Sequence, residues 1–450
     1  MRQRGGRAHG NRGEAGAMTA AKDLFSSRFE IRGRLGEGGM GEVHLAYDAF
    51  LQREVAIKLA NLKLLDDPEV GDRMRKMWMN ETRLAGKLRH PHIVEVFEAG
   101  TTDEFGYLVM EYVSGGTLKQ YARPDALLPV EQVIEDVYKT CNALDYGNKL
   151  GLLHRDIKPT NIMVTGDHVV KVADFGTAYF SKSDETQVFD VGTLPYMPPE
   201  HFRDWPPNVQ LDIYAVGVLA YQLLTGTLPF TATTFDSMLS QKLAGEYVSM
   251  EERRKDVPSA LRFVVHRAMH PDPGVRYDSW QKFCDDLRDA LPQLDRPNEV
   301  LFDTARFDTL KRLPFFGGFA DTQLWETIHL ADWLDFREGD TVFEEGNAGD
   351  SVYVIARGEA VVTRSGATLN GLGEGECIGE IAFLDEKTHA RSATVRAFSP
   401  LVLIEISAAG LHSGSTELQA AFSRAFIRIM VDRIRHADQR FLELAQKQDG

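Results

Sequence analysis

A run of glycines near the start of the chain is the first feature whose residue types could do chemistry. Gly36, Gly38 and Gly41 lie between two stretches in which apolar and polar residues alternate, as they do in β-strands. Glycine has no side chain, so such a turn lets the backbone lie close to phosphate groups. A turn between two strands differs from the strand-to-helix turn that binds dinucleotides. Taken alone, the run also fits a plain hairpin turn.

An ordered series of charged motifs follows the glycines. The series consists of VAIK at 55–58, Glu81, HRDIKPTN at 154–161, DFG at 174–176 and PPE at 198–200. In this combination and order it resembles the protein kinase family, specifically the bacterial serine/threonine type. The resemblance covers residues 29–291. Pro198 stands where the family usually has alanine, which affects no catalytic position.

The resemblance implies a phosphoryl transfer in which positioning and charge neutralisation do most of the catalysis. It implies that Asp156 accepts the proton of the incoming hydroxyl and that Lys158 neutralises the γ-phosphate. Lys58 would hold the α- and β-phosphates, and Glu81 would hold Lys58 in place. A solvated helix face is the alternative interpretation of Glu81.

ATP and Mg²⁺ are the cofactors that the resemblance implies. Asn161 and Asp174 would supply hard oxygen ligands to the metal. Met110 would be the gatekeeper beside adenine. Because every charged group is present, the sequence favours an active enzyme over an ATP-binding scaffold or pseudokinase. The nucleotide would lie against Leu35, Gly36, Gly38, Gly41, Val43, Ala56, Lys58, Glu111, Val113 and Met163.

Other positions in this region have implied structural or regulatory roles. Glu200 would pair with Arg276, Asp212 would bind the backbone of the catalytic loop, and Thr193 would contact Asp156 and Lys158.

Residues 177–191 would form the activation loop, in which Thr186 and Ser183 are the phosphorylation candidates. Arg155 makes such a modification plausible, because a dianionic phosphate can pair with a guanidinium group. An unmodified polar loop residue is the alternative for either hydroxyl.

A second group of residues points to an anionic ligand. Residues 379–382 read GEIA and residues 391–395 read RSATV, and the surrounding residues 306–412 resemble the cyclic-nucleotide-binding domain family. A cyclic phosphate is a monoanion, for which Arg391 can provide a forked, charge-assisted contact. Glu380 would accept the ribose 2′-hydroxyl. The implied ligand residues are Gly379, Glu380, Ile381, Ala382, Arg391 and Ser392.

Alternatives remain at this second site. Glu380 could be a helix-capping acid and Arg391 a surface charge, which would leave a sensor that binds no ligand. Ser392 offers a hydroxyl that could touch a guanine amino group, so both cAMP and cGMP stay open, as does the direction of any regulation.

The hydrophobic pattern places these motifs on an α+β chain. We expect strands over 29–112, and helices at 72–88, 130–149, 209–225 and 280–291. Strands between glycine turns then indicate a β-barrel or sandwich. A final helix over 417–446 follows, with one apolar face formed by Leu418, Phe422, Phe426, Ile429, Met430, Ile434 and Phe441.

We therefore expect a bilobal protein kinase fold followed by a β-roll or jelly-roll cyclic-nucleotide-binding domain with a C-terminal helix. The expected divisions are a flexible tail at 1–27, a kinase domain at 28–291, a linker at 292–305 and the nucleotide domain at 306–450. The tail has no apolar segment typical of a secretory signal, and Met18 is an alternative start.

Composition narrows the choice of partners and compartment. The 450 residues include 51 Lys and Arg against 66 Asp and Glu, a net charge of −15 that argues against nucleic-acid and anionic-membrane partners. The three cysteines, Cys141, Cys284 and Cys377, are expected to be free thiols in the cytoplasm. The expected partners are a protein substrate and a small cyclic nucleotide, and the oligomeric state stays open. A transcription regulator is disfavoured, because no helix-turn-helix segment follows the last helix.

Overall fold

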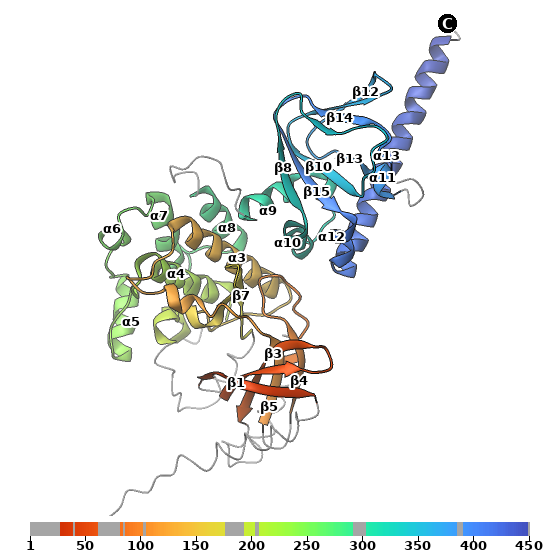
Figure 1. Cartoon of the computed structure of the whole chain (residues 1–450). Coiled ribbons are helices and arrows are strands. Elements are labelled where there is room, and N and C mark those ends of the chain that lie inside the picture. The colour runs from red at the N-terminus through yellow and green to blue at the C-terminus, as the bar shows by residue number, and fades with distance from the viewer. Residues whose placement is uncertain are drawn as a thin grey trace, which may run out of the picture. The chain divides into compact units, whose positions relative to one another are not determined.

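The computed structural model (Figure 1) organises the chain in two compact units, Met1–Pro297 and Asn298–Gly450. The structure describes residues 28–38, 41–61, 82–83, 86–101, 105–175, 193–202, 207–290, 303–384 and 390–448. Among these residues, no helix is both long and apolar enough to cross a membrane.

The alternating residues of the first unit form an antiparallel sheet in the order β1-β2-β3-β5-β4. Its strands are β1 (Phe29–Gly38), β2 (Gly41–Asp48), β3 (Arg53–Asn61), β4 (Val96–Thr101) and β5 (Phe105–Glu111). Side chains of a strand point alternately to the two faces of its sheet. Val55 and Ile57 therefore pack into one buried cluster, while Ala56 and Ala60 pack into another on the opposite face, the face that also carries Lys58.

The rest of the first unit is mainly helical. Its elements are η1 (Leu118–Tyr121), α3 (Val130–Lys149), η2 (Pro159–Asn161), β6 (Ile162–Val164), β7 (Val170–Val172), η4 (Leu194–Tyr196), η5 (Pro199–Phe202), α4 (Val209–Thr225), α5 (Phe235–Ala244), α6 (Met250–Arg253), α7 (Ser259–Ala268) and α8 (Trp280–Asp289). The predicted bounds of α3 and α4 are confirmed. Most of the helix expected over 72–88 lies outside the described residues.

Helix α4 is buried on nearly all sides, which explains its almost continuous apolar sequence. Asn208 caps its start, because its side-chain oxygen accepts a hydrogen bond from the main-chain N–H of Gln210. Gly226 ends it in the left-handed conformation, with φ of 72°. This buried helix carries Asp212, whose carboxylate accepts hydrogen bonds from the main chain of His154 and Arg155.

The second unit contains two four-stranded antiparallel sheets, β13-β10-β15-β8 and β12-β11-β14-β9. The strands are β8 (Asp332–Phe336), β9 (Thr341–Phe343), β10 (Ser351–Arg357), β11 (Ala360–Arg364), β12 (Ala367–Leu372), β13 (Cys377–Ile378), β14 (Thr394–Ala397) and β15 (Leu401–Ser407). The helical elements are α9 (Asp303–Arg312), η7 (Pro314–Phe316), α10 (Asp321–Leu330), α11 (Glu380–Leu384), α12 (Ala408–Ser413) and α13 (Thr416–Gln448). Both sheets contribute to one apolar core, as expected for a sandwich or roll.

The last helix, α13, buries only the first part of the face that its sequence predicts. Leu418, Phe422 and Phe426 are buried, and Phe422 and Phe426 contact the ring of Phe315. Ile434, which the sequence places on the same face, is 61% exposed. Periodicity continues along a helix whether or not the domain still lies beside it. The side chains beyond residue 435, including Phe441, lie outside the described residues.

Candidate functional site

Lys58 and Asp174 meet at the junction of the sheet and the helical part of the first unit. The Lys58 side chain projects from β3 and is 11% exposed, and its Nζ lies 2.6 Å from Oδ1 of Asp174. Asp174 follows β7 with φ of 61°, a conformation that few residues other than glycine adopt. Burial acts to raise the pKa of Asp174, but Lys58, together with His154 and Lys158, outweighs it and holds the pKa below its ordinary value.

Asp156 lies in a second polar group, on the loop before η2. Its Oδ2 accepts a hydrogen bond from Nδ2 of Asn161 at 2.9 Å, and its Oδ1 accepts one from the Thr193 hydroxyl at 3.1 Å. Lys158 Nζ lies 3.1 Å from Asp156 Oδ2 and donates to the Thr193 hydroxyl at 2.8 Å. The expected contact of Thr193 with both Asp156 and Lys158 is therefore present.

The amide group of Asn161 has a fixed orientation. Its nitrogen donates to Asp156 twice, to the main-chain oxygen at 2.8 Å and to the carboxylate. The amide oxygen consequently points away from Asp156 and keeps acceptor capacity, since one carbonyl oxygen has two lone pairs. Carboxylate and carbonyl oxygens are the ligands that Mg²⁺ prefers, so Asn161 and Asp174 fit a metal site.

Buried hydrogen bonds fix the backbone directly before Asp156 and directly before Asp174. The carboxylate of Asp212, on α4, accepts the main-chain N–H groups of His154 and Arg155, each at 2.7 Å. The His154 ring contacts the main-chain oxygen of Ala173 at 2.7 Å, directly before Asp174. The predicted role of Asp212 at the catalytic-loop backbone matches this geometry. Because Asp212 is buried, its pKa is raised, although the hydrogen bonds and cations around it partly offset the effect.

An apolar surface lies next to Lys58, as the implied adenine site requires. The predicted residues Ala56, Val113, Val43 and Met163 belong to one cluster, together with Met110. Leu35 is about half exposed. The Glu111 carboxylate lies 2.8 Å from Lys171 Nζ, so its side chain is fixed by the strand that precedes Asp174.

The glycine run has two different local requirements. Gly41 has φ of 145°, and a Cβ there would lie 1.7 Å from the Leu59 oxygen of β3. A Cβ at Gly36 would meet no atom within 4 Å. Gly38 pairs with Gly41 where β1 and β2 join. Sheet pairing therefore demands the glycine at 41, whereas the space at 36 is open. Three further predicted positions, Glu81, Ser183 and Thr186, lie outside the described residues.

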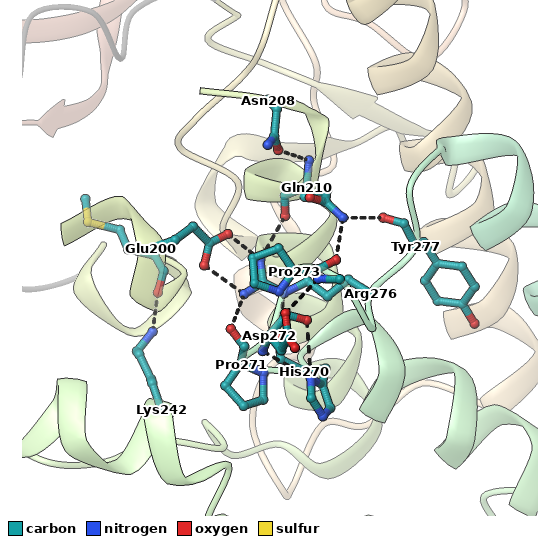
Figure 2. Close-up of polar contacts among 12 residues, drawn as sticks. Glu200, Asn208, Gln210, Lys242, His270, Pro271, Asp272, Pro273, Arg276 and Tyr277 are labelled. Carbon is teal, nitrogen blue, oxygen red and sulfur yellow. Dashed lines mark hydrogen bonds and ion pairs between the residues drawn. The ribbon is translucent and has the colours of Figure 1, made fainter. Parts of the chain in front are cut away.

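Figure 2 shows a buried ion pair in the helical part of the first unit, between Glu200 and Arg276. Arg276 donates to both carboxylate oxygens of Glu200, with 2.8 Å between Nη2 and Oε2. Arg276 also donates to main-chain oxygens of His270 and Pro271. The implied Glu200–Arg276 pair is present. Sequence reasoning missed the neighbouring Lys242, whose only signal is its position one helical turn after the buried Met238.

In the second unit Arg391 is a buried cation. It is 4% exposed, and its Nη1 donates to the main-chain oxygens of Ser351 at 2.8 Å and Gly379 at 3.0 Å. Its guanidinium lies 4.4 Å from the centre of the Phe343 ring. A Cβ at Gly349 would lie 2.2 Å from Arg391 Nε, so this glycine is needed for the close approach. The surface-charge interpretation of Arg391 is wrong.

Glu380 is also buried, at 2% exposed, and its partner comes from the last helix. Arg433 of α13 pairs with Glu380 Oε1, and its Nη2 donates to the Cys377 oxygen at 2.8 Å. Glu380 begins the short helix α11, after Gly379 in the left-handed region at φ of 83°. Arg433 was not predicted, because it occupies an ordinary polar position in the sequence of α13.

The remaining predicted ligand residues adjoin these two. Ile381 is half exposed and Ser392 is partly buried, and Ala382 lies within α11. The buried cation and carboxylate thus come together with the 379–382 and 391–392 backbone in one part of the second unit.

Known proteins resemble both units. The protein kinase domain family matches residues 29–286, and the cyclic nucleotide-binding domain family matches residues 333–413. The serine/threonine-protein kinase PknB of Mycobacterium leprae is 36% identical over 278 residues, which cover 60% of this chain and 44% of that protein. The serine/threonine-protein kinase PrkC of Bacillus subtilis is 34% identical over 282 residues, covering 62% of this chain and 42% of that protein.

This chain thus spans less than half the length of these two relatives. The kinase match itself covers more than half of the chain and includes the Lys58, Asp156 and Asp174 positions described above. The chain belongs to the protein kinase family, and a cyclic nucleotide-binding domain follows its kinase domain.

Proposed function

We propose that this chain is a protein kinase that transfers the γ-phosphoryl group of ATP to serine and threonine hydroxyls with the help of Mg²⁺. The 2.6 Å contact between Lys58 and Asp174 carries the proposal. It brings the implied phosphate-binding cation and the implied metal-binding carboxylate to one point. Similarity to serine/threonine-protein kinases supports the choice of hydroxyl.

The chain's own residues divide the work. Asp156 accepts the proton of the substrate hydroxyl, and hydrogen bonds to both of its carboxylate oxygens fix its direction. Lys158 offsets negative charge beside that carboxylate. Asn161 and Asp174 would hold Mg²⁺, which when bound neutralises charge on the β- and γ-phosphates. Lys58, next to Asp174, would bind phosphate oxygens.

The direct test is incubation of the purified chain with γ-labelled ATP, Mg²⁺ and a general protein substrate. We expect label on phosphoserine or phosphothreonine, and at least about 100-fold less label with Asp156→Asn. An ATP-binding scaffold would bind ATP and incorporate no label, and that result would contradict the proposal.

The second part of the proposal is a regulatory ligand, cAMP or cGMP. Arg391 would contact the cyclic phosphate, and Glu380 would accept the ribose 2′-hydroxyl. The support is that a buried guanidinium and a buried carboxylate lie beside one short segment of backbone. Residues 381, 382 and 392 would provide main-chain donors to the same ligand.

The contact between Glu380 and Arg433 suggests how ligand binding would reach the rest of the chain. A ribose hydroxyl that donates to the Glu380 carboxylate would alter the contact between Glu380 and Arg433. The position of α13 in the second unit would change with that contact. The ligand can shift this equilibrium only by its different affinities for the two positions of the helix. The 292–305 linker, between the proposed domains 28–291 and 306–450, would pass the change to the kinase.

Calorimetry with cAMP and cGMP tests the ligand, and kinase rates with and without it test the regulation. We expect binding of at least one nucleotide, at least about tenfold weaker binding by Arg391→Gln, and a rate that changes on saturation. 2′-Deoxy-cAMP should bind more weakly than cAMP if Glu380 holds the hydroxyl. No heat with either nucleotide would indicate a sensor that has lost its ligand.

The proposal includes phosphorylation of Thr186 or Ser183. The guanidinium group of Arg155, directly before Asp156, would pair with the added phosphate. Mass spectrometry of the ATP-treated chain should find phosphate on at least one of them. Unmodified peptides at both positions would remove this part.

A further inference from the structure

Lys242 is a buried charged residue that has no part in the roles above. It lies on α5, its exposed fraction is 0%, and its Nζ is about equally close to the ring centres of Tyr214 and Phe230, at 5.2 and 5.3 Å. Lysine is almost never fully buried unless its ammonium group has partners. The partners of Lys242 therefore indicate why a charge is kept at this place.

The Lys242 ammonium binds the main chain that follows Thr193. Nζ donates to the oxygen of Pro195 at 2.7 Å and to the oxygen of Met197 at 2.5 Å. Figure 2 shows Lys242 reaching toward this chain beside Glu200. Both acceptors lie in or next to the short helix η4, so one side chain fixes two peptide groups of a segment that has only one turn of helix.

Burial lowers the pKa of Lys242 to about 7, while nearby Glu200 acts to raise it and Arg276 to lower it. An ammonium group has three N–H donors and a neutral amine has two. Either form therefore has enough N–H groups to donate to both carbonyl oxygens.

The segment that Lys242 holds is a wall of the space beside Asp156. Thr193, at its start, touches the Asp156 carboxylate and Lys158. Tyr196 and Met197 line a small cavity together with Asp156. A substrate hydroxyl at Asp156 would lie beside this segment, because Thr193 contacts the same carboxylate. A displacement of the substrate hydroxyl from Asp156 by about 1 Å is enough to slow the reaction greatly.

We propose that Lys242 is a positioning residue for the protein substrate: it holds residues 195–197 so that a substrate hydroxyl reaches Asp156. The inference rests on the proposed kinase function. It concerns the protein substrate alone, because the ATP-side residues Lys58 and Asp174 belong to other segments of the chain.

The test compares the full chain with Lys242→Met, which keeps the length of the stem and removes every N–H donor. We expect the KM for a peptide substrate to rise at least about tenfold while the KM for ATP stays within about twofold. Lys242→Gln, which keeps two N–H donors on a shorter stem, should fall between the two. Lys282→Met, an exposed lysine on α8, is the matched control and should behave as the wild type.

Hydrogen exchange of the backbone separates this inference from the proposed function. In Lys242→Met the amides of Leu194, Tyr196 and Met197 should exchange faster than in the wild type, whether or not the chain transfers phosphate. Unchanged exchange there, or equal KM values for the peptide, would overturn the inference. A fall in kcat alone, from loss of folded protein, would also overturn it. Absence of labelling by the wild type would instead count against the proposed kinase activity.

Discussion

Lys58 and Asp174 are 116 positions apart in the chain, and their charged atoms lie 2.6 Å apart. Small alanines on both sides of Lys58 leave its side chain room on one face of the sheet. The buried bond from His154 to the Ala173 oxygen fixes the backbone directly before Asp174. Because Lys58 holds the pKa of Asp174 below its ordinary value, the carboxylate stays ionised throughout the neutral range. The pair therefore presents opposite charges where a metal-bound triphosphate needs both.

Gly41→Ala should damage the sheet, because the added methyl group would collide with the Leu59 oxygen of β3. We expect the unfolding transition of the first unit in urea to lose at least about 2 kcal/mol. Gly36→Ala is the matched control and should change stability by less than about 0.5 kcal/mol, because its methyl group meets open space. Equal losses for the two variants would show that the close approach at 41 is not the reason for the glycine.

Glu200→Gln should leave the guanidinium of Arg276 buried without its counter-charge. Removing one partner of a buried ion pair costs about 3 kcal/mol or more, so the same urea transition should shift to lower concentration. Lys282→Gln, which removes one partner of the exposed pair with Asp278, should cost less than about 1 kcal/mol. If both variants are equally stable, the Glu200–Arg276 pair contributes no more than a surface contact.

His168 makes the stability of the first unit depend on pH. Its ring lies 3.1 Å from the buried Asp136 carboxylate, and that hydrogen bond raises the pKa of His168 above its ordinary value. Because the pKa of His168 is raised, the stabilising contribution of its pair with Asp136 is complete at pH values below the ordinary pKa of histidine. It is lost as the pH rises through the raised value.

His168→Asn, which tolerates the positive φ of 58°, should therefore reduce stability more at pH 6 than at pH 9. Urea unfolding at the two pH values measures the difference between the variant and the wild type. A difference that is the same at both values would mean that the charged pair adds nothing. Asp136→Asn should abolish the same pH dependence.

Arg433→Gln should separate ligand binding from ligand response. The variant keeps Arg391, so we expect cyclic nucleotide still to bind, while the kinase rate loses most of its dependence on the ligand. Arg435→Gln, an exposed arginine two positions along α13, is the control and should respond as the wild type does. A full response by Arg433→Gln would show that this contact does not connect α13 to the ligand.

The helices, the strands and the positions of the charged site residues can be predicted well from the sequence, because they follow from local patterns. Alternation predicts β3 with Lys58 on one face, and the apolar run at 213–224 predicts a buried helix. The Arg391 and Glu380 positions also follow from a short motif. What they touch is a matter of tertiary packing, which no local pattern contains.

The partners of buried charges could not be predicted in this way. Arg433 meets Glu380 across 53 positions, and Lys242 meets Pro195 across 47. In the sequence Arg433 looks like any surface charge, and the one signal at Lys242 is its position one helical turn after Met238. Ile434 shows the opposite failure: its spacing fits the buried face of α13, but the helix has already passed the core at that point.

The most direct measurement is the initial rate of γ-phosphoryl transfer at saturating ATP and Mg²⁺ for Lys58→Met and Asp174→Asn. The exposed pair Lys282→Met and Asp278→Asn provides the same residue changes away from the site. We expect rates at least about 100-fold below the wild type for the first two variants and wild-type rates for the controls. Rates for Lys58→Met and Asp174→Asn within about twofold of the wild type would contradict it.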